Sequence, residues 1–406
     1  MNLSLYLARK LSSESGHSYT ERIIRMASLS VAISIAVMII AIGIVKGFQI
    51  EIKQKLTGFN GHLLIKNLDL NQSGEMALFP KNQPFINKIK QLPYVVTLSP
   101  FCQKPGILKT SSEAEGIQCK GVAPEYCNRF INKHIVRGRG LNNTDPSNIN
   151  SLLISETTAN RLKLDTGQKV ELYFIQDGEV RRRRPIICGI FNTGINEIDK
   201  NWAITDIRLI QRIYTHGYDS ISGYEVLFNS MTNLEQRTKR IDEELGQTLK
   251  AQSITETQNQ IFQWLGLLDM NVMVIIILMV IVAVVNMMTA LLVLIIDRTP
   301  MIGLLKSMGG RTKLIRQLFL YNGAKNLVKG LVLGNIIGLG LGTLQKYFGF
   351  ITLNEETYYV SHVPFSISII DVLSINGLTF VVCTMLLIIP AMYVARIQPV
   401  KAINFN

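Results

Sequence analysis

The chain has 406 residues, of which 48% are hydrophobic and 17% are charged. Soluble globular proteins carry about 25% charged residues, so this composition excludes an ordinary soluble protein. Long polar stretches also exclude a chain embedded in lipid throughout. The formal net charge of +13 does not indicate nucleic-acid binding, because the basic residues cluster beside apolar segments, where anionic membrane lipids attract them. We therefore predict a chain divided between a membrane part and a soluble part.

Four apolar segments predict membrane-spanning helices, over residues 27–46, 270–296, 326–345 and 372–395. A helix needs about 20 predominantly apolar residues to cross the hydrocarbon core of a bilayer. The first segment could instead be a cleaved secretory signal, because Arg22 and Arg25 precede it and Ala41-Ile42-Gly43 offers small residues at cleavage spacing. Its apolar core is longer than the roughly 7–15 residues of a signal, so we predict an uncleaved anchor.

Lysine and arginine are distributed unevenly outside the predicted spans. They are frequent in residues 1–26, in the loop 297–325 and in the tail 396–406, whereas the loop 346–371 contains Lys346 alone. Positively charged short segments tend to stay on the cytoplasmic side, so both termini and the loop 297–325 are predicted to be cytoplasmic. The region 47–269 and the loop 346–371 are then extracytoplasmic.

The region 47–269 alternates strand-like and helical runs, which predicts a large α+β extracytoplasmic domain of two lobes, inserted between the first and second spans. Strands are expected over residues 62–65, 95–100, 151–154, 170–176, 180–190 and 223–228, and helices over residues 84–91, 155–162, 206–214 and 234–248. Asp177-Gly178 predicts a hairpin turn. Residues 255–269 are expected to form a stalk helix that continues into the second span and transmits motion to it.

Cysteine and histidine give no sign of a metal or cofactor site. Cys102, Cys119, Cys127 and Cys188 lie in the predicted exported domain, where disulfides are permitted, and their spacing matches no zinc pattern. Small buried residues or one structural disulfide are expected, with the pairing left open. The histidines lack ligand spacing, and the sequence has no Walker A motif, so the chain is not predicted to be an enzyme.

Four adjacent arginines, Arg181, Arg182, Arg183 and Arg184, follow the predicted hairpin turn. In a strand, alternate side chains point to opposite faces. The run is either a solvated hairpin rim or a docking surface for an acidic partner or lipid headgroups, since clustered charge steers association.

Small and polar residues within the predicted spans indicate helix packing. In the third span, Gly330, Gly334, Gly338 and Gly342 recur every fourth residue and leave one face bare, so another helix can approach closely. A phosphate-binding loop is excluded there because no strand precedes these glycines. In the second span, Asn286 is expected to face another helix or to contact substrate.

The loop 297–325 contains a short apolar segment over residues 301–308. Pro300 is typical of a helix start, and Gly309-Gly310 is typical of a helix end. An apolar helix exposed to the cytosol needs a covering partner or lies on the membrane surface. The residues predicted to make this contact are Met301, Ile302, Leu304, Leu305, Lys306, Met308 and Gly309.

Residues 262–320 carry a resemblance to a known family. The stalk, the asparagine within the second span, Asp297-Arg298 and the run Ile302-Gly303-Leu304-Leu305-Lys306-Ser307-Met308-Gly309 together resemble the FtsX-like permease family, in particular its lipoprotein-releasing members of the LolC/LolE type. Further pieces match in order, at Gly47-Phe48, Phe59-Asn60-Gly61-His62, Gly189-Ile190-Phe191 and residues 396–402.

The resemblance implies a non-catalytic ABC permease subunit of the bacterial inner membrane. Its implied partners are a second permease subunit in a homodimer or heterodimer, cytosolic ABC ATPase subunits docking on residues 301–308, lipoprotein cargo and a periplasmic lipoprotein carrier. Phe48 and Met273 are candidate residues of a substrate cavity. No cofactor is implied. The hairpin at Asp177-Gly178 is shorter than the carrier-binding hook of LolC-type subunits, so carrier docking stays open.

Two other functions are kept as alternatives. The first is a peptide or antibiotic efflux permease of the MacB type, although those proteins usually carry a fused ATPase. The second is a transmembrane signal transducer like FtsX itself, which transports nothing and typically has a smaller exported domain.

Overall fold

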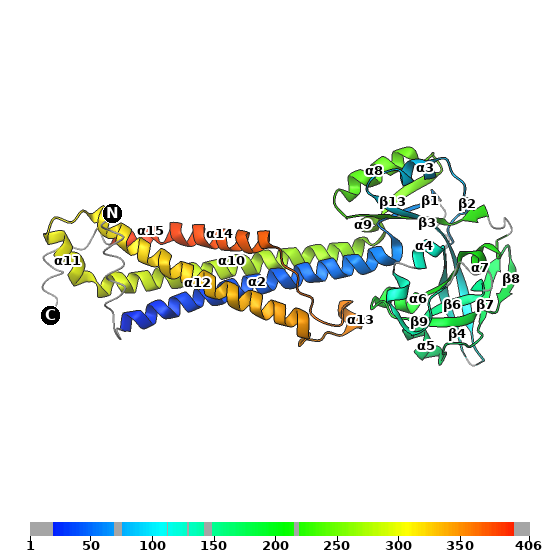
Figure 1. Ribbon diagram of the computed structural model, residues 1–406, viewed down its shortest axis with the longest axis horizontal. Helices are drawn as coiled ribbons and strands as arrows, with labels where there is room; N and C mark the ends of the chain where they lie inside the picture. The colour runs from blue at the N-terminus through cyan, green and yellow to red at the C-terminus, as the bar shows by residue number, and fades with distance from the viewer. Residues whose placement is uncertain are drawn as a thin grey trace. The chain divides into compact units, whose positions relative to one another are not determined.

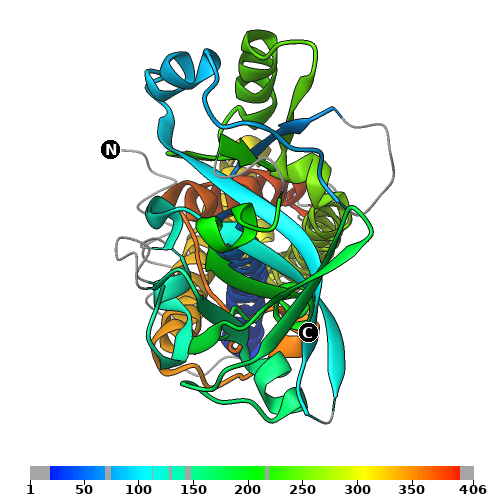
Figure 2. The same cartoon turned by 90° about the vertical axis from the view of Figure 1, so that its right-hand side faces the viewer.

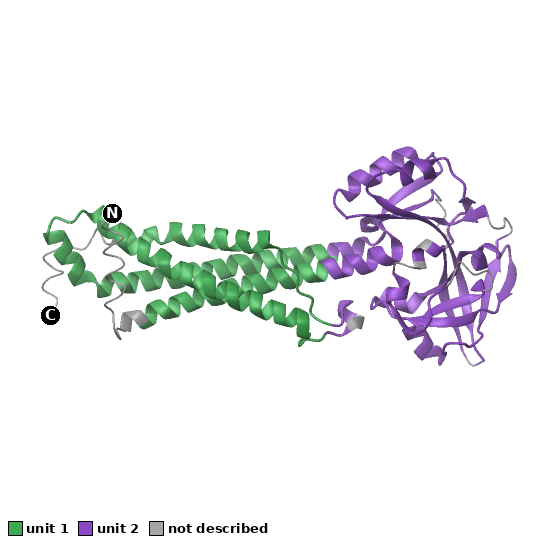
Figure 3. Cartoon of the chain, in the orientation of Figure 1, with its two compact units in different colours: residues 1–49, 264–352, 362–406 green, residues 50–263, 353–361 purple. Residues whose placement is uncertain are grey.

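A computed structural model describes residues 19–68, 75–111, 113–127, 130–141, 148–214 and 219–393. The chain divides into two compact units, residues 1–49, 264–352 and 362–406 in unit 1, and residues 50–263 and 353–361 in unit 2 (Figure 3). The predicted N-terminal segment up to residue 18 and the tail 396–406 lie outside the described residues.

Within the described residues, unit 1 is built on four helices that are long and apolar enough to cross a membrane (Figure 1). These are α2 (Tyr19–Asn60), α10 (Asn259–Asp297), α12 (Thr312–Phe348) and α14 (Ile369–Leu386), which α15 (Ile388–Tyr393) extends. α14 begins at a capping box in which Ser368 and Asp371 satisfy free backbone N–H groups. α12 ends at Gly349, whose φ of +58° favours glycine.

One face of each long helix forms the core of unit 1. On α2, the buried residues are Ala27, Val31, Ile35, Met38 and Ile39, whose spacing of three and four places them on one side. They pack with apolar residues of α10, α12 and α14. The opposite faces of α10, α12 and α14 expose large apolar side chains, as expected of helices surrounded by lipid.

Unit 2 contains a sheet of 11 strands among the described residues, in the order β13-β1-β12-β3-β4-β10-β6-β9-β5, with β7 beside β3 and β8 beside β7. Pairs β4–β10 and β6–β9 are parallel, and the other pairs are antiparallel. In Figure 2, the long cyan strands β3 and β4 cross the domain. The bounds are β1 (Leu63–Asn67), β3 (Val95–Lys109), β4 (Ala114–Val122), β5 (Ile135–Gly138), β6 (Ser151–Ser155), β7 (Glu171–Gln176), β8 (Glu179–Arg183), β9 (Ile186–Phe191), β10 (Trp202–Asp206), β12 (Gly223–Phe228) and β13 (Leu249–Ser253).

Short helices cover this sheet, and a two-stranded sheet pairs β2 (Phe79–Pro80) with β11 (Ser220–Ile221). The helices are α3 (Phe85–Lys90), α4 (Pro124–Cys127), η1 (Ile131–Lys133), α5 (Glu156–Leu162), α6 (Asn196–Asn201), α7 (Ile207–Gln211), α8 (Leu234–Glu244), α9 (Ile254–Thr257) and α13 (Glu355–Tyr358). Strand and helix together confirm the mixed character predicted for this region.

Most predicted elements of unit 2 are confirmed, including the helix over residues 155–162, which has Ser155 as its N-cap, and the turn at Asp177-Gly178, where both residues have positive φ. The single strand predicted over residues 180–190 is wrong. Pro185 separates β8 from β9, because proline has no backbone N–H for a sheet ladder. β8 pairs with β7, whereas β9 pairs with β6 and β5.

Helix ends differ more from the predictions. The helix predicted over residues 234–248 ends at Glu244, and the next residues form edge strand β13. The predicted stalk over residues 255–269 is not continuous, since α9 ends at Gln258, where φ is −114° and ψ is 41°. α2 continues well beyond residue 46, with Ile52, Leu56 and Phe59 buried at helical spacing.

Candidate functional site

The loop between α10 and α12 folds as helix α11 (Thr299–Ser307), with Pro300 in its first turn. Its end is fixed by Gly309, which has a φ of +83°, and by the bond from Gly310 N to Leu305 O at 2.8 Å. Helix start and end therefore agree with the sequence prediction.

Residues of α11 divide into a buried and an exposed side. Ile302 is fully buried in the core of unit 1, and Met301 and Leu305 pack against that core. Leu304 is 57% exposed and Met308 is 77% exposed. We call these two large, exposed apolar side chains, Leu304 and Met308, the α11 face. Ile302 had been predicted as a contact residue, but its burial makes it unavailable to a partner.

The glycines of α12 lie against neighbouring elements of unit 1. A Cβ atom added to Gly334 would lie 2.6 Å from Ala32 O on α2, and similar clashes with α2 would arise at Gly330 and Gly338. Gly342 instead lies against the ring of Phe365, 2.2 Å from such a Cβ. The backbones of α12 and α2 thus approach as closely as only glycine permits.

Polar side chains join the helices of unit 1. Asn286 of α10 donates a hydrogen bond to Ser30 Oγ of α2. A second polar pair, missed by the sequence analysis, joins Asn335 of α12 to Asn376 of α14 by two reciprocal bonds of 2.8 and 2.9 Å. The signal for this pair was present, since each asparagine is a polar residue within an otherwise apolar helix.

Arg181, Arg182 and Arg183 lie on β8 and Arg184 directly follows it, and exposure alternates along the four. Arg181 and Arg183 are half-buried and donate to the backbone oxygens of Ile213 and Arg212. Arg182 and Arg184 point to the other face and share Glu171 Oε1, at 2.7 and 3.0 Å. The Tyr173 hydroxyl and Arg184 hold the pKa of Glu171 below its usual value.

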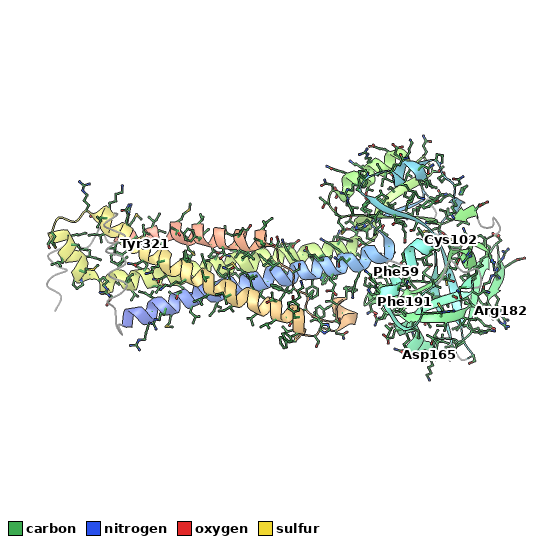
Figure 4. All side chains as sticks on the ribbon, in the orientation of Figure 1. Phe59, Cys102, Asp165, Arg182, Phe191 and Tyr321 are labelled. Carbon is green, nitrogen blue, oxygen red and sulfur yellow. The ribbon has the colours of Figure 1, made fainter. Side chains whose placement is uncertain are left out.

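One carboxylate therefore serves two exposed arginine side chains, which are 40% and 62% accessible. Figure 4 shows Arg182 extending from the rim of unit 2. We call Arg182 and Arg184 the β8 rim. The other two arginines bind backbone oxygens of Arg212 and Ile213 and hold β8 to the segment that directly follows α7.

Phe48 and Met273 lie on two different long helices of unit 1. Phe48 is half-buried on α2, and Met273 is 63% exposed on α10. A cavity of about 260 Å³ lies elsewhere, within unit 2, and its wall includes Phe59, Lys120, Trp202, Glu225 and Gln258. Substrate contact at Phe48 and Met273 stays a prediction.

The wall of that cavity contains a buried charged pair that sequence analysis missed. Lys120 Nζ lies 2.5 Å from Glu225 Oε1, and their side chains are 2% and 6% exposed. Lys120 and Phe59 meet at the end of α2, where Figure 4 labels Phe59. No local sequence pattern indicates this ion pair, because the two residues lie on strands far apart in the sequence.

The described cysteines form no disulfide. Cys102, Cys119 and Cys188 of unit 2 are free, as is Cys383 of unit 1. Burial raises the pKa of Cys102 and of Cys119 to about 12, so both remain protonated thiols near neutral pH. Of the two predicted alternatives, small buried residues fit Cys102 and Cys119, and the side chain of Cys127 lies outside the described residues.

Comparison with known proteins gives two family matches. The model of the MacB-like periplasmic core domain matches residues 26–244, which is more than half of the chain, and the model of the FtsX-like permease C-terminal matches residues 273–399.

Among curated relatives, the lipoprotein-releasing system transmembrane protein LolE of Haemophilus influenzae is 21% identical over 396 residues, covering 94% of each chain. The corresponding LolC of Xylella fastidiosa is 21% identical over 399 residues, again covering 94% of each chain. The solved periplasmic region of MacB from Actinobacillus actinomycetemcomitans aligns with 51% of this chain and 95% of that one, at 13% identity and a TM-score of 0.37.

Four described helices are long and apolar enough to cross a membrane, and the two family matches assign the chain to the permease class. The chain belongs to the family with the MacB-like periplasmic core domain, and its C-terminal part is an FtsX-like permease domain.

Proposed function

We propose that this chain is the permease subunit of an ABC machine that extracts lipoproteins from the bacterial inner membrane for transfer towards the outer membrane. The observation that carries the proposal is the match, along 94% of both chains, to relatives named as lipoprotein-releasing transmembrane proteins. The four apolar helices cross the membrane, with both termini and α11 in the cytoplasm. Unit 2 is then periplasmic.

ATP hydrolysis takes place on a separate cytosolic subunit that docks on the α11 face, and a second permease subunit completes the complex. An energy source is required physically, because withdrawing an acyl chain from a bilayer costs about 0.8 kcal/mol per CH₂. The docking surface is supported by the exposed apolar side chains of Leu304 and Met308, whereas Met301, Ile302 and Leu305 pack in or against the core of unit 1.

Reconstitution tests this function. Proteoliposomes containing the full chain, its cognate permease partner and the ATPase are loaded with a radiolabelled lipoprotein, and soluble label is measured after ATP addition. We expect release with ATP and none with a non-hydrolysable analogue. A matched cargo whose acylated cysteine is replaced by serine has no acyl chain in the bilayer and should be soluble without ATP. Absence of ATP-dependent release from a correctly assembled complex would refute the proposal.

The β8 rim is proposed to dock an acidic periplasmic carrier. Replacing Arg182 and Arg184 together with serine is expected to slow transfer to the carrier by about tenfold at low salt and less at high salt, because exposed charges steer association and salt screens them. Stopped-flow transfer measured at two ionic strengths checks this.

The matched control is Lys239→Ser with Arg240→Ser, which removes two adjacent exposed cations from α8 in the same unit. Unchanged transfer in the β8 variant, or an equal loss in the α8 control, would exclude carrier docking at the rim. Arg181 and Arg183 are left intact because they hold backbone oxygens.

A further inference from the structure

The end of α2 enters unit 2 with almost no loop. Gly61 N donates to Thr57 O at 2.8 Å, His62 N donates to Val226 O at 2.9 Å, and β1 begins at the next residue. Gly61 has a φ of +72°, which permits this abrupt change from helix to strand. α2 therefore passes directly into the sheet.

Lys120 binds the last turn of that helix. Its Nζ donates to Phe59 O at 2.5 Å, and the Tyr126 hydroxyl donates to the same oxygen at 2.8 Å. Carbonyl groups in the last turn of a helix lack partners within the helix, and cations are favourable there. An ammonium group thus supplies both a hydrogen bond and a charge to the end of α2.

The position of Lys120 ties α2 to the middle of the sheet. Lys120 lies on β4 opposite Gln103 of β3, and Glu225 lies on β12 opposite Ser99 of β3. The ion pair therefore reaches across β3 and joins its two neighbouring strands. Because β12 and β4 each have a neighbouring strand on both sides, this attachment is to the interior of the sheet rather than to an edge.

Aromatic rings enclose the same point. The Lys120 ammonium lies 4.3 Å from the ring centre of Phe59 and 4.5 Å from that of Tyr126. Phe59 also meets Trp202 edge to face, with ring centres 5.5 Å apart. A Cβ on Gly58 would lie 2.1 Å from the Phe130 ring, so the helix end is closely surrounded.

Burying this pair has an electrostatic cost. Burial lowers the pKa of Lys120 and raises the pKa of Glu225, and the charge of each residue opposes the shift of the other. Apolar residues of similar size are often at least as stabilising as a buried ion pair. Positioning of the end of α2 therefore accounts better for Lys120 and Glu225 than a contribution to the stability of unit 2 does.

The connection from unit 2 into α10 differs from the connection through α2. α9 is only Ile254–Thr257, and the helical backbone breaks at Gln258 before α10 begins. Ile254, Thr257 and Gln258 line the cavity of about 260 Å³, so space lies beside the break. The connection through α2 is clamped by a buried charge, and the connection into α10 contains an interruption next to a cavity.

We propose that Lys120 is the positioning residue that fixes the end of α2 to the sheet, so that unit 2 follows motion of α2 while the break at Gln258 absorbs bending of α10. This inference rests on the proposed function, because the motion that it transmits is the one driven by ATP. Lys120 contacts neither cargo nor nucleotide in this role, and acts through Phe59.

The test compares two buried lysines in the full complex. Lys120→Met keeps the apolar stem and removes the ammonium, and it is combined with Glu225→Gln to avoid an unpaired carboxylate. The matched control is Lys104→Met, since Lys104 is equally buried on β3 but binds Glu75 and Gln176 rather than α2. We expect the Lys120 variant to lower lipoprotein released per ATP hydrolysed by about tenfold, with ATPase activity retained. The control should keep the wild-type ratio.

A disulfide provides a rescue. A Cβ on residue 61 would lie 3.4 Å from Glu225 Cβ, close to the roughly 3.5–4.5 Å that separates Cβ atoms in a disulfide. Gly61→Cys with Glu225→Cys, added to Lys120→Met, should restore the release ratio when oxidised and lose it when reduced. The control adds Gly61→Cys to the variant with Lys120→Met and Glu225→Gln. It has the same left-handed backbone strain at residue 61 but cannot form the disulfide, so it should not restore the release ratio. A disulfide verified by mass without rescue would overturn the proposal.

Hydrogen exchange separates this inference from the proposed function. In the nucleotide-free complex, the backbone amides of residues 56–62 should exchange about tenfold faster in the Lys120 variant than in wild type. Their exchange should be unchanged in the Lys104 control. Wild-type complex that releases no lipoprotein would reject the proposed function only. Equal exchange in wild type and the Lys120 variant, or an equal loss of coupling in both lysine variants, would reject the anchor.

Discussion

Replacing Leu304 with aspartate is expected to weaken binding of the ATPase subunit by about 100-fold while leaving the permease folded. Leu304 is 57% exposed on α11, so the free chain tolerates a charge there. Closing an interface over an unpaired carboxylate costs about 3 kcal/mol or more. That cost corresponds to roughly 100-fold weaker binding. Affinity measured between purified permease and ATPase in detergent checks this prediction.

Two variants serve as controls for this effect. Leu304→Met keeps an apolar side chain of similar volume and should bind nearly as well as wild type. Leu305→Asp should behave differently, because Leu305 packs against the core of unit 1, so its loss would also lower thermal stability. Wild-type affinity in Leu304→Asp would show that the ATPase does not contact the α11 face.

Replacing Gly334 with alanine is expected to destabilise the helix bundle by about 2 kcal/mol through overpacking. The new methyl group would lie 2.6 Å from Ala32 O and 2.7 Å from Ile35 Cβ, so the backbones of α12 and α2 must separate. Thermal denaturation of the purified chain in detergent measures the change. Gly334→Leu should be more severe and prevent recovery of folded protein.

Gly340 provides the matched control on the same helix. Nothing lies within 4 Å of a Cβ added to Gly340. Gly340→Ala should therefore be neutral or stabilise the chain by up to about 1 kcal/mol, because alanine favours helix more than glycine does. Equal denaturation temperatures for the two alanine variants would contradict the close packing of α12 on α2.

Sequence patterns predicted the elements whose signal is local. The apolar segments, the glycine repeat of α12 and the proline and glycine at the ends of α11 each depend on neighbouring residues, and each lies on the helix that the pattern indicated. The missed break at Pro185 was also local. The residues on both sides of Pro185 form strands, but proline has no N–H for a sheet ladder, so the two strands are separate.

Features that depend on distant contacts could not be predicted. The continuation of α2 to Asn60 is one such feature, because it depends on the burial of Ile52, Leu56 and Phe59 in unit 2. Lys120 and Glu225 look like ordinary strand residues until β3 is placed between their strands. Which side chains of α11 are exposed likewise depends on how the helix packs against the core of unit 1.

The free, buried cysteines have a practical consequence for handling the protein. Because Cys102, Cys119, Cys188 and Cys383 are unpaired, the described fold includes no cross-link that requires an oxidising compartment or a disulfide isomerase. We therefore expect the described fold to form in a reducing host and to tolerate reductant during purification. In the redox rescue experiment, dithiothreitol would then cleave the engineered 61–225 bond while these four thiols remain as they are.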